Sequence, residues 1–324
     1  MNNVLYAANK NYFKFMITSI YSLIENNKNM PLIINIIEDG FSEEQKEFLD
    51  DLLNEYNVLY RLYPVDIVRD YLDNFNIPLW RGTEVANARL FASEIIEDAD
   101  KVLYLDSDTI ITNSISNIFK IKMEYPVNAV REFEVSSYLP QDIRKYYNSG
   151  VLLFDLTRWE EENCTEKLYS ELDLYRNILR FPDQDLLNLA LHDSIGDLPF
   201  SYNITPNTVE VLKHPYLSRK AYKDLDDNMY NQILSDLENP CIYHMIKYLT
   251  IRPWEKNNIH PFNSLFDEYF RKVYPNYEKE DVNFLLGYLP FLPEVNLLRK
   301  SFVSKKGKDT STKVIKKILN RNEL

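Results

Sequence analysis

Short apolar runs and amphipathic segments alternate along the first third of the chain. The apolar runs have the length of β-strands and cover residues 3–8, 31–39, 57–65 and 101–106. The segments between them repeat apolar residues at helical spacing, around residues 13–24, 42–56 and 84–98. The second of these segments opens with Ser42 and Gln45 in the spacing of a capping box. This alternation predicts an α/β fold in which helices cover both faces of a parallel sheet.

The pattern becomes mixed after Asp108. Three further core segments, a strand, a helix and a closing segment, are predicted within residues 146–159, 181–193 and 241–254. Beyond residue 260 the chain is aromatic and apolar through residues 282–298, and basic after that. This change predicts one large domain over residues 1–260 and a small helical C-terminal extension over residues 261–324.

Composition and charge exclude several classes of protein. With six glycines, the chain contains no GxGxxG dinucleotide loop, no P-loop and no GxSxG elbow. Residues 1–298 carry 28 basic and 47 acidic side chains, a net charge of −19, which argues against a nucleic acid partner. The two cysteines form no CxxC pair, and neither a signal peptide nor an apolar window of membrane-spanning length is found. We therefore expect a cytoplasmic protein.

Two aspartates, separated by one residue, stand at the end of the fourth apolar run, residues 101–106. Because alternate residues of an extended chain point the same way, the side chains of Asp106 and Asp108 are expected to converge. Buried carboxylates are costly unless they are paired or bind a metal, so this pair indicates a hard divalent cation. Ligands of parallel sheets bind beyond the carboxyl ends of the strands. The side chains expected in the same crevice are those of Asn9, Asn11 and Tyr12.

Two other classes of protein carry similar aspartate patterns, and the sequence fits neither. The D-x-D-x-[TV] motif of haloacid-type phosphatases follows the first strand of the domain, and its last position is here Ile110. An EF-hand loop needs glycine at its sixth position and glutamate at its twelfth. Counted from Asp106, these positions hold Ile111 and Asn117. The aspartate pair must therefore be interpreted from the segments around it.

Six ordered segments carry a resemblance to a known family. They are VLYAANKNYF at 4–13, NARL at 87–90, KVLYLDSDTII at 101–111, YYNSGVLLFDLTRW at 146–159, DQDLLN at 183–188 and the element from His244 to Trp254. In these segments the chain resembles family 8 of the glycosyltransferases, the retaining group that includes glycogenin and bacterial lipooligosaccharide galactosyltransferases. The resemblance implies a GT-A type nucleotide-sugar fold, Rossmann-like, with a mixed, mainly parallel central sheet.

The resemblance also implies a metal site and a nucleotide site. Asp106, Asp108 and His244 match the metal ligands, and this donor set suits Mn²⁺, with Mg²⁺ as the alternative. Without the other segments, His244 would be interpreted as an ordinary core histidine. The residues that match contacts to a UDP-sugar donor are Ala8, Asn9, Asn11, Tyr12, Arg89 and Ser107.

A second group of matches lies beside the donor sugar. Asn148 and Ser149 belong to the N-[AS]-G element, and Asp183 and Gln184 match the pair next to the anomeric carbon. The PDQD segment is also good helix-start chemistry, and a helix cap would hold these side chains rigidly at a cleft. Because the amide of Gln184 is a weak nucleophile, the resemblance favours same-face attack over a covalent intermediate. The leaving phosphate then accepts the proton of the acceptor hydroxyl.

The closing element departs from the family pattern H-x-x-G-x-x-K-P-W. Lys247 stands where glycine is expected, and Arg252 begins the basic-Pro-Trp segment two residues late. A glycine would let the backbone approach a phosphate closely. Lys247 and Arg252 are expected to supply positive charge to the donor phosphates instead. An acid that contacts the sugar is expected at Glu132.

Together these features predict a metal-dependent retaining hexosyltransferase. The predicted donor is UDP-galactose, with UDP-glucose next, and the acceptor is a glycan or a glycoprotein. One alternative is a glycogenin-like protein that glycosylates one of its own 24 tyrosines. The other is a catalytically silent protein that binds a sugar nucleotide or docks on a membrane.

The basic tail has two interpretations of equal weight. Residues 299–324 contain nine basic and two acidic side chains. One face of a helix here would be apolar and would lie opposite Lys316 and Lys317. It is formed by Val314, Ile315, Ile318 and Leu319. The tail is then either an interfacial helix on an anionic membrane or a soluble basic terminus. In the first case the protein would be a peripheral membrane protein on the inner face of the membrane.

Overall fold

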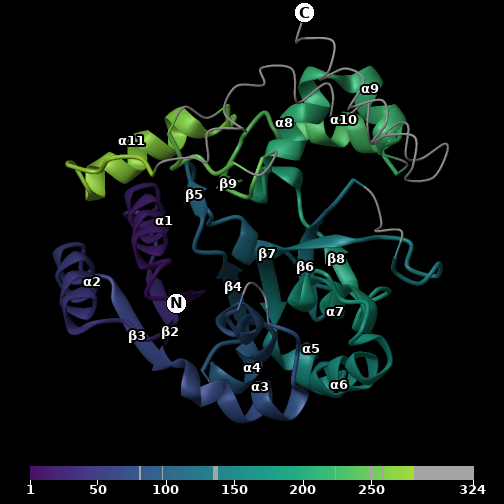
Figure 1. Ribbon diagram of the computed structural model, residues 1–324, viewed down its shortest axis with the longest axis horizontal. Helices are drawn as coiled ribbons and strands as arrows, with labels where there is room; N and C mark the ends of the chain where they lie inside the picture. The colour runs from purple at the N-terminus through teal and green to yellow at the C-terminus, as the bar shows by residue number, and fades with distance from the viewer. Residues whose placement is uncertain are drawn as a thin grey trace, which may run out of the picture.

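A seven-stranded sheet forms the centre of the structure, a computed structural model that describes residues 1–79, 82–96, 98–133, 138–222, 224–248, 251–256 and 259–280. The strand order is β3-β2-β1-β4-β7-β6-β8 (Figure 1). In chain order these strands are β1 (Asn2–Asn9), β2 (Leu32–Asp39), β3 (Leu59–Pro64), β4 (Lys101–Leu105), β6 (Val127–Arg131), β7 (Tyr147–Asp155) and β8 (Ile195–Asp197).

The sheet is mixed and mainly parallel, which confirms the expected fold class. β3, β2, β1 and β4 pair in parallel, as the strand–helix alternation predicted. β7 runs antiparallel to both β4 and β6, and β8 is parallel to β6. Because β7 runs antiparallel to β4, Val151 in the middle of β7 lies opposite Leu105 at the end of β4, and the first residues of β7 extend beyond that end. The start of β7 and the end of β4 therefore meet at one edge of the sheet.

The two faces of the sheet are buried in separate cores, as alternation along β1 shows. Val4 and Tyr6 pack in one core, with α1 (Phe13–Glu25), α2 (Glu43–Glu55), α8 (Pro206–Lys213) and α10 (Asp227–Asp236). Leu5 and Ala7 pack in the other. The helices around this second core lie together on the opposite side of the sheet (Figure 1): α3 (Arg69–Phe75), α4 (Ala92–Ile95), α5 (Leu156–Glu161), α6 (Cys164–Tyr175) and α7 (Pro182–Ala190).

Local signals predicted the start of one helix correctly and another helix only in part. Before α2, Oγ of Ser42 accepts a hydrogen bond from the Gln45 N–H at 3.2 Å, and the Ser42 N–H donates to Oε1 of Gln45 at 3.0 Å. The predicted helix at 84–98 is instead the 3₁₀ segment η2 (Val85–Phe91) followed by the single turn of α4. Nearly every side chain of η2 is buried, so tertiary contacts override the amphipathic pattern there.

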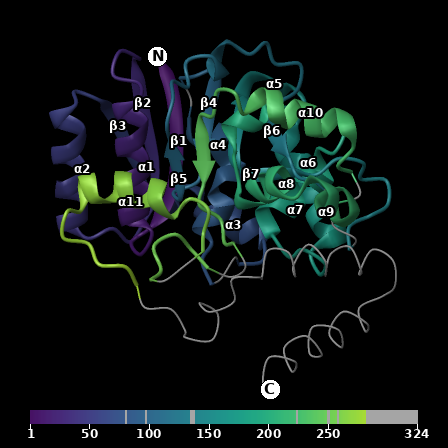
Figure 2. The same ribbon diagram turned by 90° about the horizontal axis from the view of Figure 1, so that it is seen from above.

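The structure also contains several short elements outside the main sheet and its larger helices. The 3₁₀ segments η1, η3 and η4 span Val65–Val68, Ile118–Lys120 and Phe200–Tyr202. A separate two-stranded sheet joins β5 (Thr109–Ile111) to β9 (Ile242–His244), in antiparallel orientation. α9 (Pro215–Ala221) lies beside α8 and α10, as Figure 2 shows from above. The small sheet links the end of β4 to residues far along the chain.

The last described helix, α11 (Asn263–Val273), packs against α1 (Figure 1). Phe266 and Phe270 share an apolar cluster with Phe15 of α1 and with Trp254, and the rings of Phe15 and Trp254 stack at 4.0 Å. The described part of the predicted extension thus has a core in common with the first domain. The apolar segment 282–298 and the basic tail lie outside the described residues. Among the helices of the described residues, none has the length and apolar character needed to cross a membrane.

Candidate functional site

The carboxyl ends of β1 and β4, the start of β7, the end of β9 and the start of α7 surround a cavity of about 830 Å³. Every residue that the sequence predicted for the site lines this cavity: Ala8, Asn9, Asn11, Tyr12, Arg89, Asp106, Ser107, Asp108, Glu132, Asn148, Ser149, Asp183, Gln184, His244, Lys247 and Arg252. These residues come from distant parts of the sequence. The fold therefore brings them into one place, while the role of each stays a prediction.

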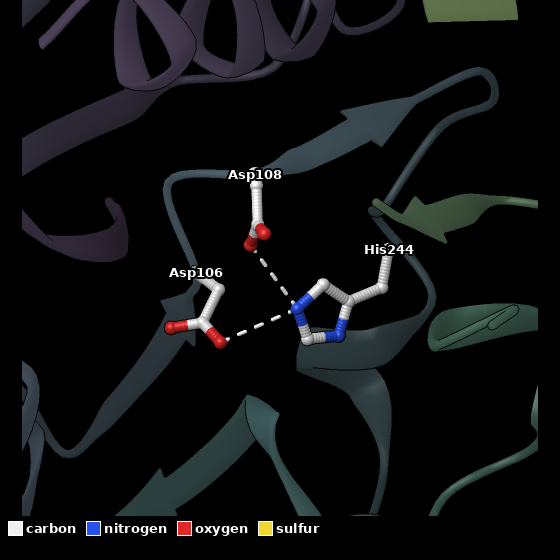
Figure 3. A group of neighbouring side chains, drawn as sticks. All are labelled: Asp106, Asp108 and His244. Atoms are coloured by element: carbon white, nitrogen blue, oxygen red, sulfur yellow. Dashed lines mark ion pairs between the residues drawn. The ribbon is translucent and has the colours of Figure 1, made fainter. Parts of the chain in front are cut away.

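Asp106, Asp108 and His244 point toward one another in the cavity wall (Figure 3). Nε2 of His244 lies 3.3 Å from Oδ2 of Asp106 and 3.2 Å from Oδ1 of Asp108. One candidate ligand atom from each residue lies within 4.8 Å of the other two. Two carboxylates and one imidazole nitrogen in this arrangement suit a divalent cation of the first transition series.

The aspartates converge for a different reason than predicted. The segment that holds them is a turn between β4 and β5, whereas an extended strand was expected. The N–H and the hydroxyl of Thr109 donate to the carbonyl oxygen of Asp106, at 3.2 and 2.9 Å. This turn curls the chain so that both carboxylates face His244.

Two backbone features place His244 beside the turn. In the β5–β9 pair His244 lies opposite Thr109, and the N–H of Met245 donates to the carbonyl oxygen of Asp108 at 2.7 Å. Gly150 provides the space for the imidazole. A Cβ atom on Gly150 would lie 2.1 Å from Cε1 of His244 and 2.8 Å from Oδ2 of Asp106. No residue larger than glycine therefore fits here unless both candidate ligands move.

Neighbouring cations keep the two carboxylates ionised. Burial raises the pKa of Asp106, but Arg89 and His244 outweigh it and hold the pKa below its usual range. Burial acts the same way on Asp108, where Arg252 and His244 outweigh it and lower the pKa. Burial lowers the pKa of His244, but the two carboxylates raise it to about 9. Both aspartates are thus ionised at neutral pH, and a cation that binds Nε2 of His244 must displace the proton there.

Arg89 connects the cluster of Asp106, Asp108 and His244 to the start of α7. Its Nη2 lies 2.8 Å from Oδ1 of Asp106, and its Nε lies 3.2 Å from Oδ2 of Asp183. Nη1 donates to the carbonyl oxygen of Ser149 at 2.8 Å, and the guanidinium lies 4.6 Å from the ring centre of Tyr104. All three guanidinium nitrogens thus contact protein atoms. Arg89 fixes two carboxylates relative to each other, which the sequence did not predict.

Ser149 holds the two predicted catalytic side chains of α7. Its N–H donates to Oε1 of Gln184 at 3.1 Å, and its hydroxyl donates to Oδ2 of Asp183 at 2.8 Å. Burial raises the pKa of Asp183, and Arg89 and Ser149 counteract only part of this, so the pKa stays above its usual value. Pro182 occupies the first turn of α7, as expected for a helix start. The start of α7 therefore also places Asp183 and Gln184 at the cavity.

Two further polar residues stabilise the site, and the sequence did not single them out. Asp185 is fully buried and accepts hydrogen bonds from the hydroxyls of Tyr138 and Tyr146 and from the N–H groups of Arg180 and Phe181. It therefore fixes the turn that leads into α7. Asp185 belongs to the DQD segment, so the sequence could have indicated it as a site residue. Asn203 contacts His244 from the side away from the aspartates, at 3.1 Å, and no motif pointed to it.

The end of the cavity where a nucleotide was predicted is formed by the turn between β1 and α1. Oδ1 of Asn9 accepts hydrogen bonds from the N–H groups of Asn11 and Tyr12, at 3.1 and 3.2 Å. The hydroxyl of Ser107 donates to the carbonyl oxygen of Ala7 at 3.0 Å, which ties the aspartate turn to the end of β1. Asn9 and Ser107 thus shape the wall that a nucleotide would meet.

Arg252 and Lys247 add positive charge to the same cavity. Nη1 of Arg252 contacts Oδ2 of Asp108 and the carbonyl oxygen of Met245. The guanidinium also lies 5.2 Å from the ring centre of Trp254. Arg252 is therefore a counter-ion of a candidate metal ligand, and the predicted contact of both basic side chains with donor phosphates stays a prediction.

Fold and cavity together define a class of protein. An α/β sheet with an acidic cluster beyond its strand ends and a neighbouring polar pair is the arrangement of a GT-A glycosyltransferase. The model of glycosyl transferase family 8 matches residues 3–258, and the chain belongs to this family. Membership implies transfer of a sugar from a nucleotide-sugar donor to a glycan acceptor.

Similar proteins agree with this assignment. A putative glycosyltransferase of Haemophilus influenzae is 24% identical over 221 residues, which are 65% of this chain and 66% of that protein. The lipopolysaccharide 1,2-glucosyltransferase of Escherichia coli K12 is 28% identical over 269 residues, 80% of this chain and 74% of that enzyme. The crystal structure of the galactosyltransferase LgtC with donor and acceptor sugar analogs matches with a TM-score of 0.70 at 21% identity, over 83% of this chain and 95% of that chain. This structural likeness supports the fold.

Proposed function

We propose that the protein is a metal-dependent retaining hexosyltransferase with a UDP-hexose donor and a glycan or glycoprotein acceptor. One observation supports this proposal above all: the Asp106–Asp108–His244 cluster and the Asp183–Gln184 pair line the same cavity. Galactose is the proposed sugar and glucose the next choice. Similarity to a galactosyltransferase structure and to a glucosyltransferase sequence supports keeping both.

The residues present fit a divalent cation. Asp106, Asp108 and His244 would hold it, and this mixed oxygen and nitrogen donor set favours Mn²⁺, with Mg²⁺ as the alternative. The close approach of the cluster to Gly150 leaves no room for a further side chain between the ligands. A bound ion would supply positive charge for the departing diphosphate.

The chain's own residues account for the chemistry at the sugar. Asp183 and Gln184, held by Ser149, would stabilise positive charge at the anomeric carbon. The bond from that carbon to the phosphate oxygen breaks, and the bond to the acceptor oxygen forms on the same face. The proton of the acceptor hydroxyl passes to the phosphate oxygen that leaves. Since an amide is a weak nucleophile, this route is favoured over a covalent intermediate.

The remaining contacts of the donor follow the shape of the cavity. Asn148 and Glu132 are proposed to face the sugar, because the Asn148 amide donates to Oε1 of Glu132 at 2.9 Å and both line the cavity. Lys247 and Arg252 are proposed to contact the diphosphate. The uridine is proposed to lie against the turn after β1, beside Ala8, Asn9, Asn11 and Tyr12.

UDP release from a panel of UDP-sugars, with and without Mn²⁺, tests the proposal. We expect wild-type protein to turn over one UDP-hexose only with metal, and Asp108→Ala to lose at least about 100-fold in rate. Asp193→Ala, which removes a carboxylate that is 87% exposed, serves as the matched control and is expected to act like wild type. Absence of UDP binding in the presence of Mn²⁺ would contradict the proposal. A mass increase of the protein itself would indicate self-glycosylation.

Residues 1–260 are proposed to form the catalytic domain, with residues 261–324 as an extension. The described beginning of the extension supports an anchored arrangement, because α11 packs against α1. A cytoplasmic location and attachment to an anionic membrane through the basic tail stay predictions. Binding of the full chain and of a chain ending at Glu280 to anionic and neutral vesicles would test the second.

A further inference from the structure

The two ring nitrogens of His244 face different partners. Figure 3 shows one of them turned toward the two aspartates and the other turned away from them. Nε2 faces the carboxylates of Asp106 and Asp108, at 3.3 and 3.2 Å. Nδ1 lies 3.1 Å from Oδ1 of Asn203, whose side chain is only 2% exposed. Which nitrogen carries the proton decides whether Nε2 has a lone pair to offer a cation, since a neutral imidazole has one donor and one acceptor nitrogen.

The orientation of a neighbouring amide follows from a backbone group. The N–H of Gly150 lies 2.9 Å from the side chain of Asn148, and because an N–H can only donate, the atom that it meets is Oδ1. Nδ2 of Asn148 then faces Oε1 of Glu132 at 2.9 Å, where a carboxylate accepts. A donor on one side and an acceptor on the other thus define one orientation of Asn148.

This orientation is passed on to Asn203 and then to His244. The same oxygen of Asn148 lies 2.8 Å from the side chain of Asn203, so Asn203 must present its Nδ2 there. Its Oδ1 consequently faces His244 and can only accept a hydrogen bond. Nδ1 of His244 must then carry a proton, so the nitrogen that gives up its proton to a cation is Nε2, between the two aspartates.

Backbone pairing holds Asn203 at this distance. The next residue, Ile204, donates from its N–H to the carbonyl oxygen of Ile242 at 2.8 Å and accepts from the N–H of His244 at 2.9 Å. The N–H of Asn203 itself donates to the carbonyl oxygen of Phe200 at 3.2 Å. Asn203 is therefore anchored on both sides, and its amide has little freedom to leave the imidazole.

We propose that Asn203 is a positioning residue of the cation site. It keeps His244 in the tautomer in which Nε2 is a ligand, and it couples this ligand to Asn148 at the sugar end of the cavity. The proposal rests on the proposed function, because it takes the ligand to be a divalent cation. It assigns to Asn203 no contact with the substrate.

Mn²⁺ affinity tests this role directly. The full chain is titrated with Mn²⁺ in the presence of UDP and followed by electron paramagnetic resonance, and uridine binding without metal is measured as a reference. Asn203→Leu removes the acceptor at similar size, while Asn203→Asp keeps an acceptor for Nδ1 but cannot donate to Asn148. The control is Asn35→Leu, which alters another fully buried amide, one that donates to Asn3 at 3.1 Å outside the cavity.

We expect Asn203→Leu to bind Mn²⁺ about 10- to 100-fold more weakly, with uridine affinity unchanged, as for other residues that orient a metal-ligating histidine. Asn203→Asp is expected to keep most of the affinity, and Asn35→Leu all of it. If Asn203→Leu does not fold, Asn203→Ser leaves Nδ1 without its acceptor and is expected to lose at least about tenfold.

Unchanged Mn²⁺ affinity in Asn203→Leu or Asn203→Ser overturns the inference. A parallel loss of Mn²⁺ and uridine affinity overturns it too, because general damage to the fold would then explain the result. Failure of the wild-type protein to bind Mn²⁺ with UDP is a different outcome, in which the proposed function itself is wrong.

Discussion

The cavity has two walls that are held in place in different ways. The wall proposed to meet the nucleotide, residues 8–12 and here called the nucleotide wall, is a local turn in which Asn9 accepts from N–H groups only two and three residues away. The wall proposed to hold the metal, here called the metal wall, is formed by Asp106, Asp108, Gly150, Asn203 and His244. It depends on contacts such as those from His244 to Asn203, 41 residues apart, and from Arg252 to Asp108, 144 residues apart. Damage to the nucleotide wall should therefore stay local, whereas the metal wall should fail as a unit.

The largest effect is expected from Gly150→Ala, which strikes the centre of the metal wall. The added Cβ would lie 2.1 Å from Cε1 of His244, so imidazole and carboxylate must both move. We expect Mn²⁺ affinity in the presence of UDP to fall by more than about 100-fold, since a displaced ligand should cost more than a disturbed partner of a ligand. Uridine affinity without metal is the control, and a parallel loss of it would show that the two walls are not separate.

Arg89→Lys is expected to have the next largest effect. A lysine cannot contact Asp106, Asp183 and the Ser149 carbonyl together, so a buried carboxylate loses its partner at a cost of about 3 kcal/mol of unfolding free energy. Turnover should fall with it, because both ends of the site are disturbed. Arg61→Lys is the matched control, since Arg61 pairs with Asp98 at 2.6 Å on the surface and the change should cost less than about 1 kcal/mol. Chemical denaturation measures both, and equal losses would contradict the account.

A pH effect is expected from His260, a buried histidine bonded to the segment that follows β9. Its Nε2 lies 2.9 Å from the carbonyl oxygen of Ile246, and its Nδ1 accepts from the N–H of Phe262 at 3.2 Å. Burial lowers the pKa of His260 from 6.5 to about 4, so the unfolded chain takes up a proton first as the pH falls. The stabilisation is complete above pH 6.5 and is lost as the pH falls to about 4, by at most about 1.4 kcal/mol per pH unit.

Unfolding free energies measured across this pH range check the His260 prediction. His260→Gln cannot titrate, while its amide can still donate and accept, so its stability should depend less steeply on pH than that of the wild type. Identical slopes for the two proteins would mean that His260 does not link stability to pH. The difference between the slopes isolates this one group from the other titrating side chains.

The smallest effect is expected from Asn9→Ala in the nucleotide wall. The change removes the side-chain acceptor for the Asn11 and Tyr12 N–H groups, and the loss of these turn hydrogen bonds costs about 1 kcal/mol. Uridine affinity should fall, while the affinity of the UDP-bound protein for Mn²⁺ should stay the same. Calorimetric titrations with uridine and with Mn²⁺ separate the two quantities. A matching loss of Mn²⁺ affinity would remove the distinction between the walls.

The same contrast explains what the sequence could predict. The parallel half of the sheet and the Ser42–Gln45 cap follow from apolar periodicity and spacing within a few residues. The helix expected over 84–98 was correct only in part: residues 85–95 are helical, but most of them form a 3₁₀ segment, whose burial depends on contacts that its own pattern does not reveal. Apart from Glu132, the predicted site residues come from six short segments with recognisable chemistry, and all of them line one cavity, while their roles stay predictions. Asn203 was missed because its importance lies in contacts with His244 and Asn148, and no local pattern encodes them.

The most direct test of the account is a crystal structure of the full chain with Mn²⁺ and UDP, with anomalous scattering recorded to locate the manganese. We predict one strong peak between Oδ atoms of Asp106 and Asp108 and Nε2 of His244, with the UDP diphosphate beside it and uridine against the nucleotide wall. A structure with UDP bound and no manganese at this cluster, or with manganese held elsewhere, would contradict the central claim that these three residues form the metal site.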